Sequence, residues 1–219
     1  MPTSTRASVT AAIADSGVVA VIRMTDPSRL GEVVSGLVEG GIRTLEVTMT
    51  VPGAIEHIRR LAPTLPAGFL LGAGTVTDGD TAARVIDAGA AFIVSPVFRR
   101  DVLEVSHRAD TLAIPGCFTP TEILDAWDAG AGLIKVFPAT ALGPGYLKDL
   151  RGPLPHVKLV PTGGVTVENA GDWIRAGAVA VGIGTALLDT KAIASGALDV
   201  VVARARQLVA NVARARGIA

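Results

Sequence analysis

Eight short apolar runs, regularly spaced along the chain, constrain its fold more than any other feature. Segments with helical periodicity separate these runs, and one such segment opens with the capping box Thr119-Pro120-Thr121-Glu122. The runs begin 20 to 26 residues apart and cover residues 18–23, 44–49, 70–76, 92–96, 112–117, 133–138, 158–162 and 180–185. Eight strands that alternate with helices predict a closed parallel (β/α)8 barrel, or TIM barrel, formed by a single domain over residues 1–219.

An open, doubly wound α/β sheet is the alternative arrangement of such a pattern. That fold usually contains a GxGxxG turn followed by an acidic residue that binds ribose. The glycine-rich turns at 72–74 and 182–184 lack this continuation, so the barrel is favoured. We also expect an extra N-terminal helix at about residues 4–16, covering the barrel bottom. A C-terminal helix is expected at about residues 197–216, with its apolar face on the barrel rather than on a membrane.

Charge and composition exclude several classes of protein. The formal net charge is zero, which argues against a nucleic-acid or anionic-membrane partner. The chain contains no long uncharged apolar span, and residues 1–16 lack the basic start and apolar centre of a signal peptide. The single cysteine, Cys117, cannot form an internal disulfide. These features together predict a cytoplasmic protein.

Lys135 interrupts the apolar run at 133–138, which otherwise has the composition of a fully buried strand. A buried ammonium group is unfavourable unless it is paired or loses its proton. The chain has only four lysines although arginine is abundant, and arginine does not deprotonate in proteins. We therefore consider Lys135 a candidate for amine chemistry.

The alternation of side chains along each strand predicts which residues point into the barrel. This alternation directs four polar residues inward, most of them in the carboxyl-terminal half of their strands, where barrel enzymes have their active sites: Arg23, Glu46, Thr75 and Lys135. In the third strand, the same reasoning places Leu71 and Ala73 inward together with Thr75.

Two roles are open for Lys135 and Glu46. A structural ion pair is one, although a buried pair usually contributes little net stability compared with apolar packing. The other is a lysine nucleophile that attacks a carbonyl to form an iminium, beside a carboxylate that transfers protons. Burial lowers the pKa of such a lysine and an ionised Glu46 raises it, and the sequence leaves this balance open.

Two glycine-rich segments predict a phosphate site. They lie at 161–165, after the seventh strand, and at 182–187, after the eighth. Glycine lets backbone amides approach an anion closely, a following helix offers its positive end, and barrels often bind phosphate at these two loops. Thr185 could add a hydroxyl donor. The alternative is that the glycines only form tight turns.

No metal or cofactor site is expected. His57 and His107 lie in predicted helices and His156 in a loop, so a histidine-bound metal ion at the strand ends is poorly supported. Cys117 is interpreted as a buried apolar residue rather than a nucleophile.

Six short motifs, in order, resemble the bacterial 2-keto-3-deoxy-6-phosphogluconate (KDPG) and 4-hydroxy-2-oxoglutarate aldolase family. They are LEVT at 45–48, GAGTV at 72–76, SP at 95–96, IPG at 114–116, KVFP at 135–138 and PTGG at 161–164. The resemblance extends over about residues 18–188. It implies a trimeric (β/α)8 barrel and a metal-free Schiff-base aldolase that needs no cofactor and forms a covalent imine on its lysine.

The resemblance also implies roles for individual residues. The lysine matches Lys135 and the catalytic glutamate Glu46, while Thr75 matches a pyruvate-contacting threonine. Phe137 matches an aromatic wall, and the phosphate-binding positions match Gly163, Gly164, Gly184 and Thr185. Many members have an arginine at the position of Thr50, whereas others have one matching Arg23, which we expect to contact the carboxylate or an adjacent oxygen.

The predicted reaction is the cleavage of KDPG to pyruvate and glyceraldehyde 3-phosphate. Residues 143–148 are similar to those of relatives that cleave the galactonate epimer, so this epimer and 4-hydroxy-2-oxoglutarate are alternative substrates. A sugar-phosphate isomerase or epimerase, and a non-catalytic binding barrel, are more distant alternatives.

Overall fold

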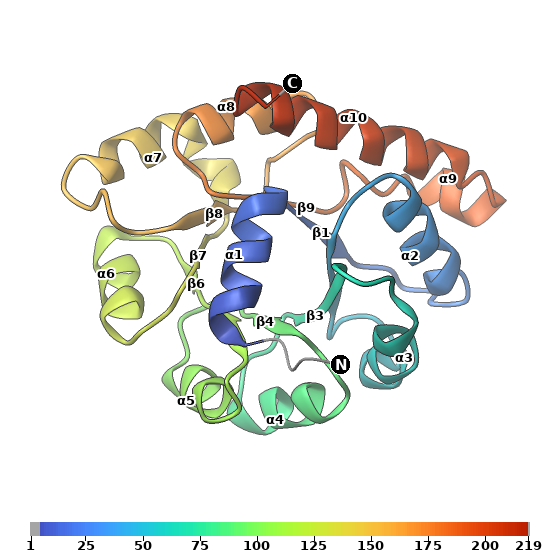
Figure 1. Ribbon diagram of the computed structural model, residues 1–219, viewed down its shortest axis with the longest axis horizontal. Coiled ribbons are helices and arrows are strands. Elements are labelled where there is room, and N and C mark those ends of the chain that lie inside the picture. The colour runs from blue at the N-terminus through green and yellow to red at the C-terminus, as the bar shows by residue number, and fades with distance from the viewer. Residues whose placement is uncertain (1–4, 219) are drawn as a thin grey trace.

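The computed structural model describes residues 5–218 and shows parallel strands surrounded by helices (Figure 1). The strands are short, and most of them end one or two residues before the end of the apolar run that predicts them. Their bounds are β1 (Val18–Ile22), β2 (Thr44–Thr48), β3 (Leu70–Gly74), β4 (Phe92–Val94), β5 (Leu112–Ile114), β6 (Gly116–Cys117), β7 (Ile134–Val136), β8 (Leu159–Pro161) and β9 (Val181–Ile183).

The strands form a curled parallel sheet in two hydrogen-bonded parts. One part has the order β5-β4-β3-β2-β1-β9 and the other the order β6-β7-β8. A single bridge between Thr162 and Gly182 connects the end of β8 to β9. The fifth predicted strand is divided into β5 and β6 at Pro115, whose nitrogen cannot donate to the ladder. The eight predicted strands are therefore nine in the structure.

Helices follow most strands and cover the outside of the sheet (Figure 1). The capping box predicted before residue 122 is confirmed: Thr119 accepts a hydrogen bond from Glu122 N, and the Glu122 carboxylate accepts one from Thr119 N at 2.8 Å. The helices after the first strand are α2 (Leu30–Glu39), α3 (Ala54–Leu61), α4 (Gly79–Asp87), α5 (Arg100–Arg108), α6 (Pro120–Asp128), α7 (Gly143–Arg151), α8 (Ala170–Arg175), α9 (Thr190–Ser195) and α10 (Asp199–Ala215), with 3-10 turns η1 (Ala62–Thr64) and η2 (Ala139–Ala141).

Alternation along the strands divides the apolar core into two clusters. The outer cluster lies between the strands and the helices and includes Ile22, Leu45 and Val136. The inner cluster, called here the sheet interior, contains Val19, Phe92, Val94, Leu112, Ile114, Leu133, Val160 and Ala180. Glu46 and Lys135, considered below, belong to this inner face.

Helix α1 (Arg6–Ser16) lies across the sheet at the amino ends of its strands (Figure 1). Val9 and Ile13 from this helix pack into the sheet interior. The helix ends at Gly17, which has φ 72°, and the chain then enters β1 directly. Residue 4, where we expected the helix to begin, is outside the described residues. Within residues 5–218, no helix combines the length and the hydropathy needed to cross a membrane.

The predicted inward face of the third strand is wrong. Leu71 and Ala73 belong to the outer cluster, and glycines 72 and 74 occupy the interior face. A Cβ atom on Gly72 would lie 2.6 Å from the Phe92 ring, and one on Gly74 would lie 1.7 Å from Glu46 Oε1. Glycine is thus required in β3 because neighbouring strands fill this space with larger side chains.

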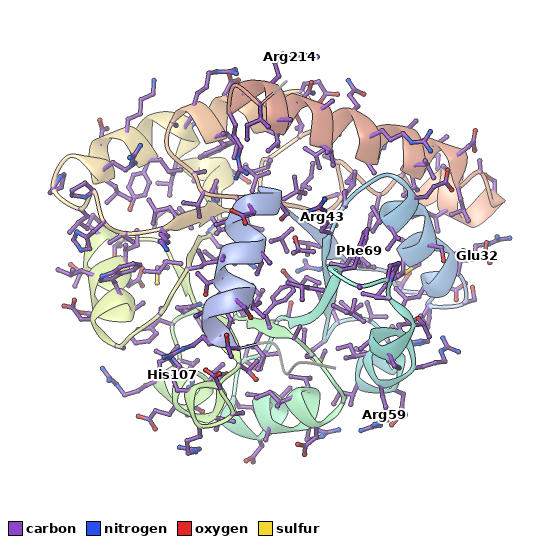
Figure 2. The ribbon with its side chains drawn as sticks, in the orientation of Figure 1. Glu32, Arg43, Arg59, Phe69, His107 and Arg214 are labelled. Carbon is purple, nitrogen blue, oxygen red and sulfur yellow. The ribbon has the colours of Figure 1, made fainter. Side chains whose placement is uncertain are left out.

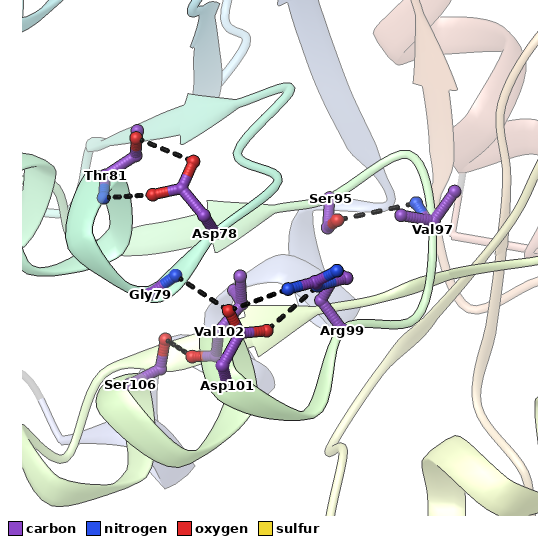
Figure 3. A network of polar contacts seen from close by, with 9 residues as sticks. All are labelled: Asp78, Gly79, Thr81, Ser95, Val97, Arg99, Asp101, Val102 and Ser106. Atoms are coloured by element: carbon purple, nitrogen blue, oxygen red, sulfur yellow. Dashed lines mark hydrogen bonds and ion pairs between the residues drawn. The ribbon is translucent and has the colours of Figure 1, made fainter.

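A polar network connects the loops that follow β3 and β4 (Figure 3). The carboxylate of Asp101 accepts hydrogen bonds from Gly79 N at 3.1 Å and from Arg99 Nε at 3.0 Å. Asp78 caps α4 by accepting from Thr81 N at 2.7 Å. The hydrogen bond from Arg99 is the main cause that lowers the pKa of Asp101 to about 2. The network joins the starts of α4 and α5 at the carboxyl ends of the strands.

Candidate active site

Glu46 and Lys135 are the two ionisable side chains of the sheet interior, and both are nearly inaccessible. Glu46 in β2 is 2% exposed and Lys135 in β7 is 6% exposed. The flanking residues of each, such as Leu45 and Val136, pack outward against the helices, so the alternation turns the two polar groups inward. The structure therefore brings together the two residues for which the sequence predicts proton transfer and amine chemistry.

Burial dominates the ionisation of both groups. It raises the pKa of Glu46, against the opposing charges of Lys135 and Arg23. It lowers the pKa of Lys135, and Arg23 adds to this effect while Glu46 opposes it. The balance left open by the sequence is thus resolved toward an amine that releases its proton more readily than a free lysine.

The interaction between Glu46 and Lys135 is not a close ion pair. Among the described residues, Glu46 Oε1 has no hydrogen-bond partner, and no contact within 4.0 Å joins the carboxylate to Lys135 Nζ. A purely structural salt bridge therefore does not account for their burial. Two buried groups with shifted pKa values in one interior are typical of a functional site.

Phe137 directly follows β7, the strand that carries Lys135. Thr75 directly follows β3, which lies next to β2, the strand that carries Glu46. The Phe137 ring centroid lies 4.6 Å from Lys135 Nζ, so the aromatic face forms one wall beside the amine. Thr75, directly after β3, has φ 60°, an unusual conformation for a β-branched residue. Residues in such strained conformations concentrate at binding and catalytic sites. The left-handed backbone also interrupts the strand alternation, so the pattern of β3 does not assign Thr75 to either face.

Arg23 and Thr50 lie beyond the ends of β1 and β2, and both are exposed. Thr48 donates a hydrogen bond to Ile22 O at 3.1 Å, and its hydroxyl is 2.7 Å from that of Thr50. These bonds fasten the carboxyl end of β2 to that of β1. The Thr50 hydroxyl is therefore engaged with that of Thr48.

A cavity of about 200 Å³ opens past the carboxyl ends of β1, β7, β8 and β9. It is lined by Val21, Arg23, Phe137, Thr162, Gly163, Gly184, Thr185, Leu188 and Thr190. Five predicted site residues thus meet in one cavity, while Gly164 is adjacent in sequence. Arg23 also borders a second cavity of about 250 Å³ that extends toward Arg29 and α9.

The glycines of the first predicted phosphate loop are required by its geometry. Gly163 and Gly164 have φ 91° and 73°, which side-chain-bearing residues rarely adopt. A Cβ atom on Gly164 would also lie 2.9 Å from Thr140 Cα. Among the described residues, the backbone N–H groups of Gly164 and Val165 have no hydrogen-bond acceptor, whereas the N–H of Gly163 faces Gly182 O in the bridge between Thr162 and Gly182. Consecutive free N–H groups form a concave anion site of the kind called a nest.

Histidines and Cys117 have other surroundings. His107 lies on α5 near the start of α1 (Figure 2), and His156 packs edge-on against Trp127 with ring centroids 5.6 Å apart. Across residues 5–218, no group of three or more His, Cys, Asp and Glu side chains is arranged to hold a metal ion. Burial raises the pKa of the Cys117 thiol to about 12, which disfavours a nucleophilic thiolate.

Sequence reasoning missed three residues that shape this region. Gly74 gives room to the Glu46 carboxylate, Thr140 packs on the glycine loop, and Asn169 binds that loop from outside. Gly74 was part of a recognised motif, but glycine shows no side-chain pattern. Thr140 lies in the turn η2 after β7, and Asn169 lies just before α8; neither belongs to a motif or to a strand pattern, so neither gave a signal.

A curled parallel sheet with buried ionisable groups and a glycine-lined cavity past its strand ends defines an α/β protein of the class that binds ligands at the carboxyl edge of the sheet. The profile of the KDPG and KHG aldolase family matches residues 9–204. The chain belongs to this family.

Individual relatives agree with this assignment. The 2-dehydro-3-deoxy-phosphogluconate aldolase of Dickeya dadantii is 36% identical over 80% of this chain and 82% of its own length. A probable 2-dehydro-3-deoxy-6-phosphogalactonate aldolase of Rhizobium meliloti is 34% identical over 77% and 80%. The crystal structure of KDPG aldolase from Legionella pneumophila, with pyruvate captured as a covalent carbinolamine, superposes with a TM-score of 0.84 at 31% identity, covering 91% of this chain and 97% of that one.

Proposed function

We propose that the protein is a Schiff-base aldolase that cleaves a 2-keto-3-deoxy-6-phospho sugar acid, KDPG in the first place, to pyruvate and glyceraldehyde 3-phosphate. The observation that carries this proposal is the burial of Lys135 in the same interior as Glu46, with its pKa lowered mainly by burial. Such an amine is available as a nucleophile at a lower pH than an exposed lysine.

The reaction begins when neutral Lys135 Nζ attacks the C2 carbonyl of the substrate. The resulting carbinolamine loses water to give an iminium. A base removes the proton of the C4 hydroxyl, the C3–C4 bond breaks, and its electron pair moves toward the iminium to form an enamine while the aldehyde leaves. Protonation at C3 and hydrolysis by water then release pyruvate and free lysine. Glu46 is the group proposed to transfer these protons, because its raised pKa suits both acceptance and release.

The two ends of the substrate are assigned to different residues. Thr75 and Arg23 orient the carboxylate end, and Phe137 forms the wall beside the imine. The loop at Gly163 and Gly164, the N–H group of Gly184 and the Thr185 hydroxyl bind the distal phosphate. The free amides of the first loop and its two left-handed glycines support this assignment. Fixing both ends supplies the orientation that the cleavage step requires.

The galactonate epimer is the second candidate substrate. Relatives of similar identity are named for cleavage of the phosphogluconate and of the phosphogalactonate compound. The family also includes aldolases that act on 4-hydroxy-2-oxoglutarate (KHG), a compound without a phosphate group. Separate kcat/KM values on the three compounds would rank them, and a strong preference for the third would contradict the phosphate assignment.

Borohydride reduction in the presence of pyruvate tests the central claim. We expect a stable adduct on Lys135 by peptide mass mapping and none in Lys135→Arg. Glu46→Gln should slow turnover more than it weakens pyruvate trapping. An active wild-type enzyme that gives no adduct would refute the imine mechanism, and equal loss of both properties in Glu46→Gln would refute the proton-transfer role.

Four broader properties complete the proposal. The Thr162–Gly182 bridge supports a full (β/α)8 barrel, because it continues the strand order from β8 to β9. The resemblance to the family supports a homotrimer. The imine mechanism needs neither metal nor cofactor, so turnover should survive dialysis against a chelator. We further propose that the protein is cytoplasmic.

A further inference from the structure

Asn169 binds the glycine loop from the side opposite the free amides. Its Nδ2 donates to Gly164 O at 2.9 Å, and its Oδ1 accepts from Thr166 N at 2.8 Å. Its backbone N–H is also held, because it donates to Thr166 Oγ1 at 3.1 Å. A single side-chain amide therefore fixes the loop on both sides of Val165.

These bonds determine the direction of the loop amides. The peptide bond between Gly164 and Val165 is trans, so its C=O and N–H point in opposite directions. Holding the Gly164 carbonyl on Asn169 turns the Val165 N–H away from this side chain. Thr162, which precedes the two glycines, is also fixed through its backbone. Its N–H donates to Val136 O at 3.0 Å, and its carbonyl accepts from Ala139 N at 2.9 Å.

Among the described residues, Asn169 provides the side-chain hydrogen bonds to the backbone of Gly164 and Thr166 in the outer half of the loop. Gly163 and Gly164 have no side chains of their own and occupy conformations open to glycine, so the loop has little intrinsic rigidity. Without the amide, the Gly164 carbonyl could rotate and the free N–H groups would no longer converge. Asn169 itself does not line the cavity.

We propose that Asn169 is a positioning residue that holds the amides of Gly164 and Val165 in the direction that binds the phosphate of the substrate. This inference rests on the proposed function for the identity of the anion. On this inference, Asn169 helps the protein to distinguish phosphorylated from non-phosphorylated keto acids, although its side chain contacts neither of them.

The test compares Asn169→Ala on two substrates, one with and one without phosphate. For KDPG, or its galactonate epimer if that is preferred, we expect KM to rise about ten-fold, the size of one lost hydrogen bond to a charged group, with kcat changed much less. The KM for 4-hydroxy-2-oxoglutarate and the yield of pyruvate trapped on Lys135 should stay at the wild-type level. Unchanged trapping also shows that the variant is folded.

Asn211→Ala is the matched control. Its Nδ2 donates to Val167 O at 2.8 Å, so the same amide-to-carbonyl bond is removed three residues further along the segment. Asn211→Ala should leave both KM values unchanged. The inference is overturned if Asn169→Ala leaves the KM for the phosphorylated substrate within two-fold of wild type, raises both KM values equally, or behaves as Asn211→Ala does.

Titration with inorganic phosphate separates this inference from the proposed function. If the wild-type protein cleaves none of the keto acids, the aldolase proposal fails, but the loop can still be tested by calorimetry. A wild-type protein that binds phosphate about ten times more tightly than Asn169→Ala supports the positioning role. Equal affinity in the two proteins, or no binding to the wild type, overturns it.

Discussion

Lys135 and Glu46 make the stability of the protein depend on pH in opposite ways. Because burial lowers the pKa of Lys135 below 10.5, the unfolded chain binds more protons, and the free energy of unfolding falls as pH decreases from 10.5 toward the folded pKa. Because burial raises the pKa of Glu46 above 4.5, this group contributes fully to the free energy of unfolding below pH 4.5. That contribution is lost as the pH rises through the pKa of Glu46 in the folded protein. At neutral pH, both groups therefore oppose folding.

We expect the double variant Lys135→Met/Glu46→Gln to be more stable than the wild type at pH 7, by about 1–4 kcal/mol, because an apolar side chain replaces a desolvated amine. Urea denaturation measures the difference, and Lys148→Met, at an exposed lysine of α7, is the control. Lower stability of the double variant would show that the two groups attract each other more strongly than burial opposes them.

The interior positions of Glu46 and Lys135 could be predicted because each polar residue interrupts an apolar alternation. The same reasoning failed in β3, where glycines 72 and 74 face the interior. Glycine has no side chain, so the apolar residues Leu71 and Ala73 alone could not indicate which face is inward. The direction of Thr75 was unpredictable for another reason, since its positive φ ends the strand pattern.

The starts of α4 and α5 are coupled through Asp101, and this coupling should respond to acid. The pKa of Asp101 is about 2 in the folded protein against an ordinary 3.8, so its contribution is present above pH 3.8 and is lost as pH falls toward 2. Asp101→Asn should therefore destabilise the protein at pH 6, and the difference from wild type should shrink below pH 3.8. Urea denaturation across this range measures it.

The control for this prediction is Asp80→Asn, at an acidic residue of α4 whose carboxylate accepts no hydrogen bond from Gly79 among the described residues. A constant difference between Asp101→Asn and the wild type from pH 6 to pH 2.5 would contradict the assigned role of the carboxylate charge.

Helix starts were predictable where the capping residues are local. Thr119 and Glu122 define the start of α6 through bonds three residues apart, and the sequence contains all of that information. The tie between Asp101 and Gly79 spans 22 residues and depends on how α4 packs beside α5, so no local pattern indicates it. The division of the fifth strand at Pro115 was visible in the sequence but was not interpreted.

The two ends of the described chain are joined by Arg216. Its guanidinium donates to Asp15 O and Ala14 O, both at 2.7 Å, at the end of α1, and also to Val179 O before β9. One side chain at the end of α10 therefore holds α1 against the sheet. Arg214, in contrast, lies on the outer surface of α10 (Figure 2).

We expect Arg216→Met to lower the free energy of unfolding by about 1–3 kcal/mol, because partly buried carbonyl groups lose their donor. Arg214→Met should have little effect, since that side chain is exposed. Hydrogen exchange of α1 amides gives a second measurement, with faster exchange expected only in Arg216→Met. Equal stability of the two variants would exclude the proposed link between the ends.

The arrangement of the whole molecule was predictable to the level of strands alternating with helices, because each element has its own periodicity. The hydrogen-bonded division of the sheet was not, since it depends on the single bridge at Thr162 and on the register around Pro115. The bonds of Arg216 to Asp15 and Ala14 were equally hidden, because they join residues 201 and 202 positions apart.

Helix α1 also affects how small molecules can reach the interior of the sheet. With Val9 and Ile13 packed across the amino ends of the strands, the cavity past their carboxyl ends is the entrance that the fold provides. Phe137 lines this cavity, and its ring centroid lies 4.6 Å from Lys135 Nζ, so the cavity offers a route to the amine. On the proposed imine mechanism, the aldehyde fragment would leave first, and pyruvate would follow only after water hydrolyses its bond to Lys135.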